Sequence, residues 1–153
     1  MNELPSVRSF LSTYFPVFMG TIFACIFTLV FAVPVFFDSY VPNLSMADNA
    51  KYSFLAGIAL TLVVVHCNFM IARGRPHWAR ALVGLLGLCF LSMLPTLSEQ
   101  PNKVMYALSL LLPLLGLLLL NSKRHREMRS RLVEIRRQRE AIIQASKASR
   151  ARR

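Results

Sequence analysis

The chain has 153 residues, with 18 Lys and Arg against 7 Asp and Glu, a net charge of +11, and yet 55% of it is hydrophobic. That apolar content excludes an intrinsically disordered chain, which lacks the residues to build a core. Twelve of the basic residues lie in residues 121–153, so an apolar body, residues 1–120, is joined to a basic tail. The body contains apolar runs long enough to cross a bilayer, which indicates a polytopic membrane protein rather than a soluble domain.

The body is expected to contain four membrane spans. The first, residues 14–37, is uncharged over 24 residues, more than the ~30 Å hydrocarbon layer requires and too long for the core of a cleaved signal peptide. The others are residues 54–72, 81–97 and 104–120, near the short end of the spanning range. The third could instead be a buried helix or a re-entrant hairpin, because Pro95 and a short connection follow it. The predicted fold is all-α: an integral membrane four-helix bundle with a C-terminal cytoplasmic basic helix.

The loops predict the orientation of these spans. Arg8, three arginines in residues 73–80 and the basic tail fall on one side of the membrane, whereas only Lys51 and Lys103 fall on the other. Because Lys and Arg are retained in the cytoplasm during insertion, we expect both termini to be cytoplasmic. Every Tyr and the single Trp lie at span ends, where amphipathic rings prefer the headgroup layer: Tyr14, Tyr40, Tyr52, Trp78 and Tyr106.

The interiors of the spans contain no acidic or basic residue, which argues against an ion-coupled pump or an intramembrane hydrolase. The possible intramembrane polar site is His66 with Asn68, which could accept a proton or contact a ligand, or could only link helices. No metal or cofactor is expected, since the other histidines, His77 and His125, lie outside the spans. The cysteines form no Cys-x-x-Cys pair, and no catalytic constellation is present, so we lean against an enzyme.

Small residues and prolines mark positions where the spans could pack or bend. Gly20 with Ala24, and Gly84 with Gly87, would let helices approach closely, either within the chain or between copies of it. Pro113 removes a backbone donor inside the fourth span and is a candidate hinge.

The tail is expected to be a helix that continues from the fourth span, because it has no Gly or Pro. Its apolar residues Met128, Leu132, Ile135 and Ile142 lie along one face of the helix and form a narrow seam. Glu127 is spaced to form an ion pair with Arg131. The tail could lie on anionic lipid or dock on a partner or on itself; nucleic acid is disfavoured without a recognisable binding fold. The residues expected to contact lipid or a partner are Lys123, Arg124, Arg126, Met128, Arg129, Arg131, Leu132, Ile135, Arg136, Arg137 and Ile142.

One loop carries a resemblance to a group of known proteins. Residues 74–80 read Gly-Arg-Pro-His-Trp-Ala-Arg and precede a Leu/Gly-rich span. This loop resembles the Gly-Arg-x-Trp-Ala-Arg loop of small four-span bacterial inner-membrane proteins of uncharacterised function, as does the end of the fourth span, residues 117–123. The resemblance implies a bacterial inner (plasma) membrane and brings no activity with it.

Together these features predict a small protein that acts by association, as an accessory or regulatory subunit of a membrane assembly. The alternative is a homo-oligomeric channel or transporter of a small or lipophilic solute, with Pro113, His66 and Asn68 along its path.

Overall fold

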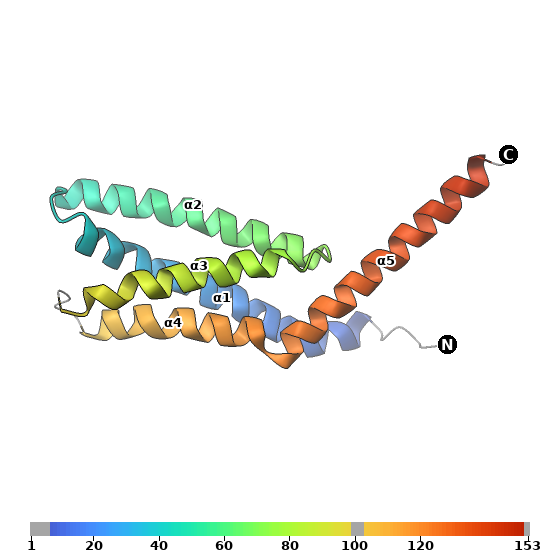
Figure 1. Cartoon of the computed structure of the whole chain (residues 1–153), viewed down its shortest axis with the longest axis horizontal. Coiled ribbons are helices and arrows are strands. Elements are labelled where there is room, and N and C mark those ends of the chain that lie inside the picture. Colours follow the sequence, from blue (N-terminus) through green and yellow to red (C-terminus); the bar gives the residue numbers. More distant parts are fainter. Residues whose placement is uncertain (1–6, 99–102, 152–153) are drawn as a thin grey trace.

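A computed structural model describes residues 7–98 and 103–151, and within these ranges the chain is helical without any strand, which confirms the all-α class (Figure 1). Four helices pack side by side, and a fifth leaves their end obliquely. The elements are α1 (Val7–Tyr40), α2 (Met46–Ala72), α3 (Trp78–Met93), a 3₁₀ turn η1 (Leu94–Ser98), α4 (Lys103–Asn121) and α5 (Lys123–Ala151).

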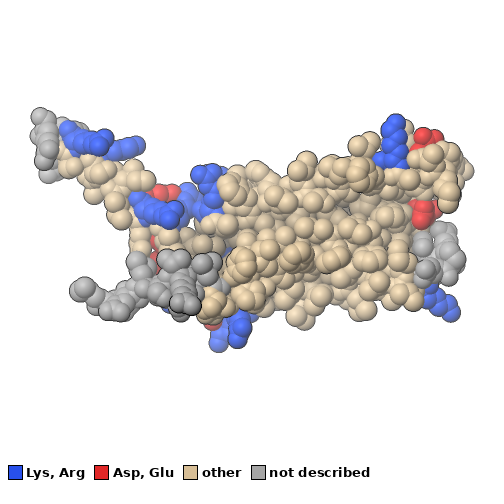
Figure 2. All heavy atoms as spheres, turned by 180° about the vertical axis from the view of Figure 1, so that it is seen from behind, with Lys and Arg blue, Asp and Glu red and all other residues tan. Residues whose placement is uncertain are grey.

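Four of the helical segments are long and apolar enough to cross a membrane, as expected for a multi-pass membrane protein. They cover Ser12–Tyr40, Met46–Ala72, Trp78–Thr96 and Lys103–Asn121. Figure 2 shows charged side chains gathered at the two ends of this bundle and along the projecting helix, with an uncharged body between them. The connection between the third and fourth spans at residues 99–102 lies outside the described residues.

The end of the bundle opposite α5 is held by polar contacts that hydropathy does not register. Ser45 caps α2, since its hydroxyl accepts from the Asp48 amide at 3.2 Å and donates to the Asp48 carboxylate at 2.7 Å. The helix therefore begins at Met46, earlier than the apolar run at Phe54. Tyr40, at the end of α1, donates its hydroxyl to the Ser92 carbonyl at 2.9 Å and so joins α1 to α3.

The four apolar helices surround a core to which α1 contributes against α2, α3 and α4. α4 lies close to α3 and α1 at Gly116, where a Cβ would lie 2.9 Å from Leu86 Cδ1 and 3.8 Å from Ala24 Cβ. The small-residue face at Gly20 and Ala24 therefore packs within the chain. The main buried cluster includes Cys25, Leu29, Val64, Cys67, Ile71, Leu82, Leu86 and Leu120.

The other predicted small-residue face remains open. A Cβ on either Gly84 or Gly87 would meet nothing within 4 Å, so this part of α3 faces away from the other described residues. Pro113 is buried inside α4, which continues past it to Asn121.

The turn between α2 and α3 depends on a glycine. Gly74 has φ of +77°, the left-handed conformation in which a helix commonly ends and which side chains disfavour. Its amide donates to the Ile71 carbonyl at 2.9 Å, and the Arg75 amide donates to the Met70 carbonyl at 3.1 Å. These bonds pair the last carbonyls of α2 and turn the chain toward α3.

The tail does not continue the fourth span as one helix, contrary to the prediction. The helix is interrupted at Ser122, whose amide donates to the Leu119 carbonyl at 3.2 Å. The Ser122 hydroxyl then accepts from the His125 amide at 3.3 Å and caps the start of α5. Because α5 begins anew, it leaves in a different direction from α4 (Figure 1).

Candidate functional site

His66 and Asn68, the predicted intramembrane polar pair, lie on different faces of α2. His66 is exposed on the outside of the bundle, where its ring meets Trp78 edge to face at 5.1 Å between centroids. Asn68 is 3% exposed, and its amide donates to the Val64 carbonyl at 2.8 Å. The two side chains therefore do not form a joint site within one copy of the chain, and each makes a local contact.

The first half of α5 packs against the bundle. Met128 is 4% exposed and belongs to the same apolar cluster as Ile71 and Ala79, with Leu132 packed beside it. The predicted seam thus begins as an internal contact. The backbone of α5 lies close to Gly74, because a Cβ on this residue would lie 2.8 Å from the Leu132 carbonyl oxygen and 3.1 Å from Arg136 Cβ. The α2–α3 turn and the backbone of α5 are in contact only because residue 74 has no side chain.

His125, three residues before Met128 on α5, is fully buried. Neither ring nitrogen has a hydrogen-bond partner among the described residues. Burial lowers the pKa of His125 from 6.5 to about 4, with a further lowering by the nearby Arg129. The side chain is therefore neutral in the docked helix, and a proton on it would oppose docking.

A basic groove runs between the α2–α3 turn and α5. It has a volume of about 620 Å³ and is lined by Pro76 together with Arg126, Arg129, Arg137 and neighbouring residues of α5. Burial and the adjacent Arg126 lower the pKa of Arg129. Neither ion pair found in the described part of the chain uses these three arginines. The groove is therefore lined by three arginines and one carboxylate, Glu134, and its net positive charge favours a phosphate or carboxylate group.

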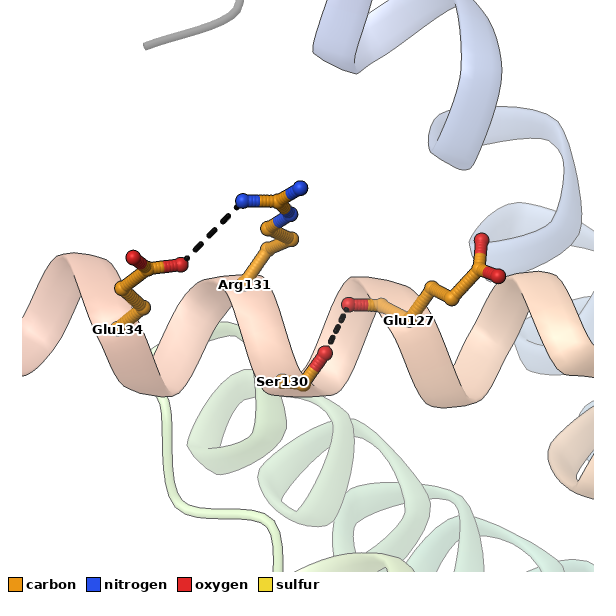
Figure 3. Close-up of polar contacts among 4 residues, drawn as sticks. All are labelled: Glu127, Ser130, Arg131 and Glu134. Carbon is orange, nitrogen blue, oxygen red and sulfur yellow. Dashed lines mark hydrogen bonds and ion pairs between the residues drawn. The ribbon is translucent and has the colours of Figure 1, made fainter. Parts of the chain in front are cut away.

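The ion pairs of α5 differ from the predicted one. The Arg131 guanidinium lies toward Glu134 at 3.4 Å rather than toward Glu127, whose backbone carbonyl accepts from Ser130 instead (Figure 3). A second pair joins Arg136 to Glu140 at 2.7 Å. Both pairs are exposed and run along the helix, so they support α5 itself. Glu134 also lines the basic groove, where it offsets part of the charge of the three arginines.

The second half of α5 makes no packing contact of this kind. Every described side chain from residue 137 to residue 150 is exposed, and Ile142 and Ile143 are 69% and 52% exposed. Among the other predicted contact residues, Lys123, Arg124 and Arg131 are exposed, while Ile135 and Arg136 are partly buried. The seam therefore divides into a docked part that ends near Arg136 and a free part beyond it.

Two residues that matter at this site carry no signal of their role in the sequence. Gly74 stood in the Gly-Arg-Pro turn, which signals a loop but does not show which element packs on it. His125 lies in a strongly basic stretch, and nothing in that stretch marks it as buried.

No family model matches the chain, and no curated protein or solved structure matches it either.

Proposed function

We infer that this protein is an accessory or regulatory subunit of a membrane assembly, anchored by its four spans and bound to its partner through α5. The observation that carries the proposal is the exposed second half of α5. It presents two adjacent isoleucines between arginines and lysine, on a helical segment that the bundle does not support.

Such a segment favours a bound state for two physical reasons. Its 15 residues, 137–151, are at the limit of about 12 to 15 residues below which a helix is marginal in water without packing. Burial of each isoleucine against a partner would contribute roughly 1.5–3 kcal/mol. The arginines around the pair favour an acidic partner surface, and the open basic groove at Arg126 and Arg129 extends this preference toward the bundle.

The direction of α5 supports a protein partner over a lipid surface. α5 leaves the end of the bundle obliquely and extends away from the four spans, and it does not lie flat across the end of the bundle (Figure 1). The distribution of Lys and Arg in the loops supports a cytoplasmic position for α5, and the loop resemblance at residues 74–80 supports a bacterial inner membrane.

The test is crosslinking mass spectrometry in native membranes at endogenous expression. We compare the wild-type chain with the double variant Ile142→Asn and Ile143→Asn, and with a matched control, Ser146→Asn and Ser149→Asn, on the same exposed segment. Loss of a stoichiometric heterologous crosslink in the isoleucine variant alone supports the proposal.

Two results would overturn it. Self-crosslinks alone, equal in all three chains, would remove the case for a partner. Protection of amides 137–150 from hydrogen exchange in nanodiscs of anionic lipid but not of phosphatidylcholine, lost in the isoleucine variant while no partner crosslink is found, would assign α5 to lipid instead.

A further inference from the structure

A second surface lies at the opposite end of the bundle, in an apolar groove between α1 and α2. The groove has a volume of about 670 Å³ and is partly open. Its walls include Pro34 of α1 and Phe54, Ile58 and Leu62 of α2, and the last three are 68%, 44% and 64% exposed. These residues lie within the membrane-spanning segments, so the groove opens toward the hydrocarbon of the bilayer.

The floor of the groove is open at a glycine. Gly57 lines it, and a Cβ built on this residue would meet nothing within 4 Å. The missing side chain therefore does not serve close helix packing, in contrast to Gly116, where a Cβ would lie 2.9 Å from Leu86. It leaves room that a ligand can fill.

The length of the groove indicates the kind of occupant. Along α1 it runs from Leu29 to Asp38 and along α2 from Leu62 to Met46, which at the helical rise is about 14 Å and about 24 Å. These lengths bracket the depth of one leaflet, about 15 Å of hydrocarbon and about 20–22 Å with the headgroup layer. A single lipid chain fits this depth, whereas a transmembrane helix of a partner would run along both leaflets.

The polar end of the groove is built around a carboxylate. Asp38 Oδ1 accepts from the Asn49 side-chain amide at 2.6 Å, and Asn49 Oδ1 in turn accepts from the Ser53 hydroxyl at 3.2 Å. These bonds hold Asp38 at the groove mouth and leave Oδ2 to accept a further donor. Neither ion pair of the described residues involves Asp38.

We propose that this groove binds one chain of a membrane lipid with a primary ammonium headgroup, of the phosphatidylethanolamine class, with the ammonium donating to Asp38. A carboxylate attracts the cation, and a primary ammonium has three N–H donors for it. A choline headgroup has no N–H to donate, and a glycerol headgroup carries no positive charge. The proposal does not depend on α5 or its partner.

The experiment uses the full chain in phosphatidylcholine nanodiscs that contain a small fraction of a photoreactive-chain lipid. The lipid is phosphatidylethanolamine, phosphatidylcholine or phosphatidylglycerol, and mass spectrometry measures labelling of residues 29–62. We expect ethanolamine lipid to label the groove about threefold to fivefold more than the other two, and Asp38→Asn to remove this preference. Equal labelling by all three lipids would overturn the headgroup assignment.

Filling the groove tests the chain site separately. Gly57→Leu should lower labelling by all three lipids about tenfold, because the new side chain occupies the floor. Gly84→Leu is the matched control, since its Cβ also meets nothing within 4 Å but lies on α3. Thr61→Phe, from the same groove, repeats the test if Gly57→Leu does not fold. Labelling equal to that of the control in the folded groove variants would overturn the site.

Discussion

The two halves of α5 have the same kind of sequence and different surroundings. Residues 123–136 and 137–151 are both basic, and Met128 and Ile142 occupy the same seam, two heptads apart. Met128 is nevertheless 4% exposed and Ile142 is 69% exposed. What separates them is the reach of the bundle, because the α2–α3 turn contacts α5 as far as Arg136. The amphipathic pattern marks a binding face in both halves, and only packing tells which half is already occupied.

The largest effect is expected from Gly74→Ala, which should reduce the difference in burial between the two halves of α5. The added Cβ would lie 2.8 Å from the Leu132 carbonyl and force a side chain into a positive φ, so we expect docking of α5 to weaken by about 3 kcal/mol. Hydrogen exchange of amides 125–136 in nanodiscs should rise toward that of amides 137–150. Gly84→Ala, in open space, should leave exchange unchanged. If Gly74→Ala also leaves it unchanged, the turn does not hold α5.

A smaller effect is expected at mildly acidic pH, where His125 begins to bind a proton in the undocked form. Its pKa is about 4 when docked and 6.5 ordinarily, so the undocked form binds the proton more readily between these values. Docking should be complete above pH 6.5 and should weaken as the pH falls from there toward about 4. His125→Leu should remove this dependence and strengthen docking by about 1–2 kcal/mol, because no buried polar nitrogen is left unpaired.

Hydrogen exchange of amides 125–136, corrected for its intrinsic pH dependence, measures this effect. His77→Leu is the control, since His77 is exposed in the turn before α3. A pH dependence that persists in His125→Leu would assign the proton to another group.

The smallest effect is expected from a change in the exposed second half of α5. Glu140→Gln removes the exposed pair with Arg136, whose nitrogen lies 2.7 Å from the carboxylate, and should loosen the second half of α5 by ~0.3–0.5 kcal/mol. Exchange of amides 137–150 should rise slightly, with no change at amides 125–136. Glu127→Gln makes the same charge change outside both ion pairs and should do less. Equal effects of the two variants would mean that net charge, not the pair, stabilises the segment.

The four apolar helices could be predicted from the sequence because membrane length and composition constrain them directly. Hydropathy found every apolar run, and only the ends moved, as where the Ser45 cap extends α2 to Met46. Caps are short-range polar bonds that an average over an apolar window does not register.

The site depends on tertiary contacts that one sequence does not encode in its spacing. The seam in the tail was visible, but the break at Ser122 and the contact at Gly74 decide where α5 points and how much of it is buried. His66 and Asn68 are neighbours in sequence, yet positions i and i+2 of a helix face different directions. The groove at Gly57 requires that α1 packs beside α2, and the spacing of residues in one sequence does not indicate which helices pack together.

The contact at Gly74 also makes α5 a lever. Beyond Arg136 the helix extends for 15 residues, about 22 Å at the helical rise, while its first half rests on the turn that joins two spans. A sideways pull at the free tip acts on a pivot next to Gly74 and Ser122. Motion of the proposed partner at Ile142 and Ile143 would therefore be transmitted as a tilt to the spans that α5 contacts, α1, α4 and α2, and a tilt of those spans would swing the tip in return.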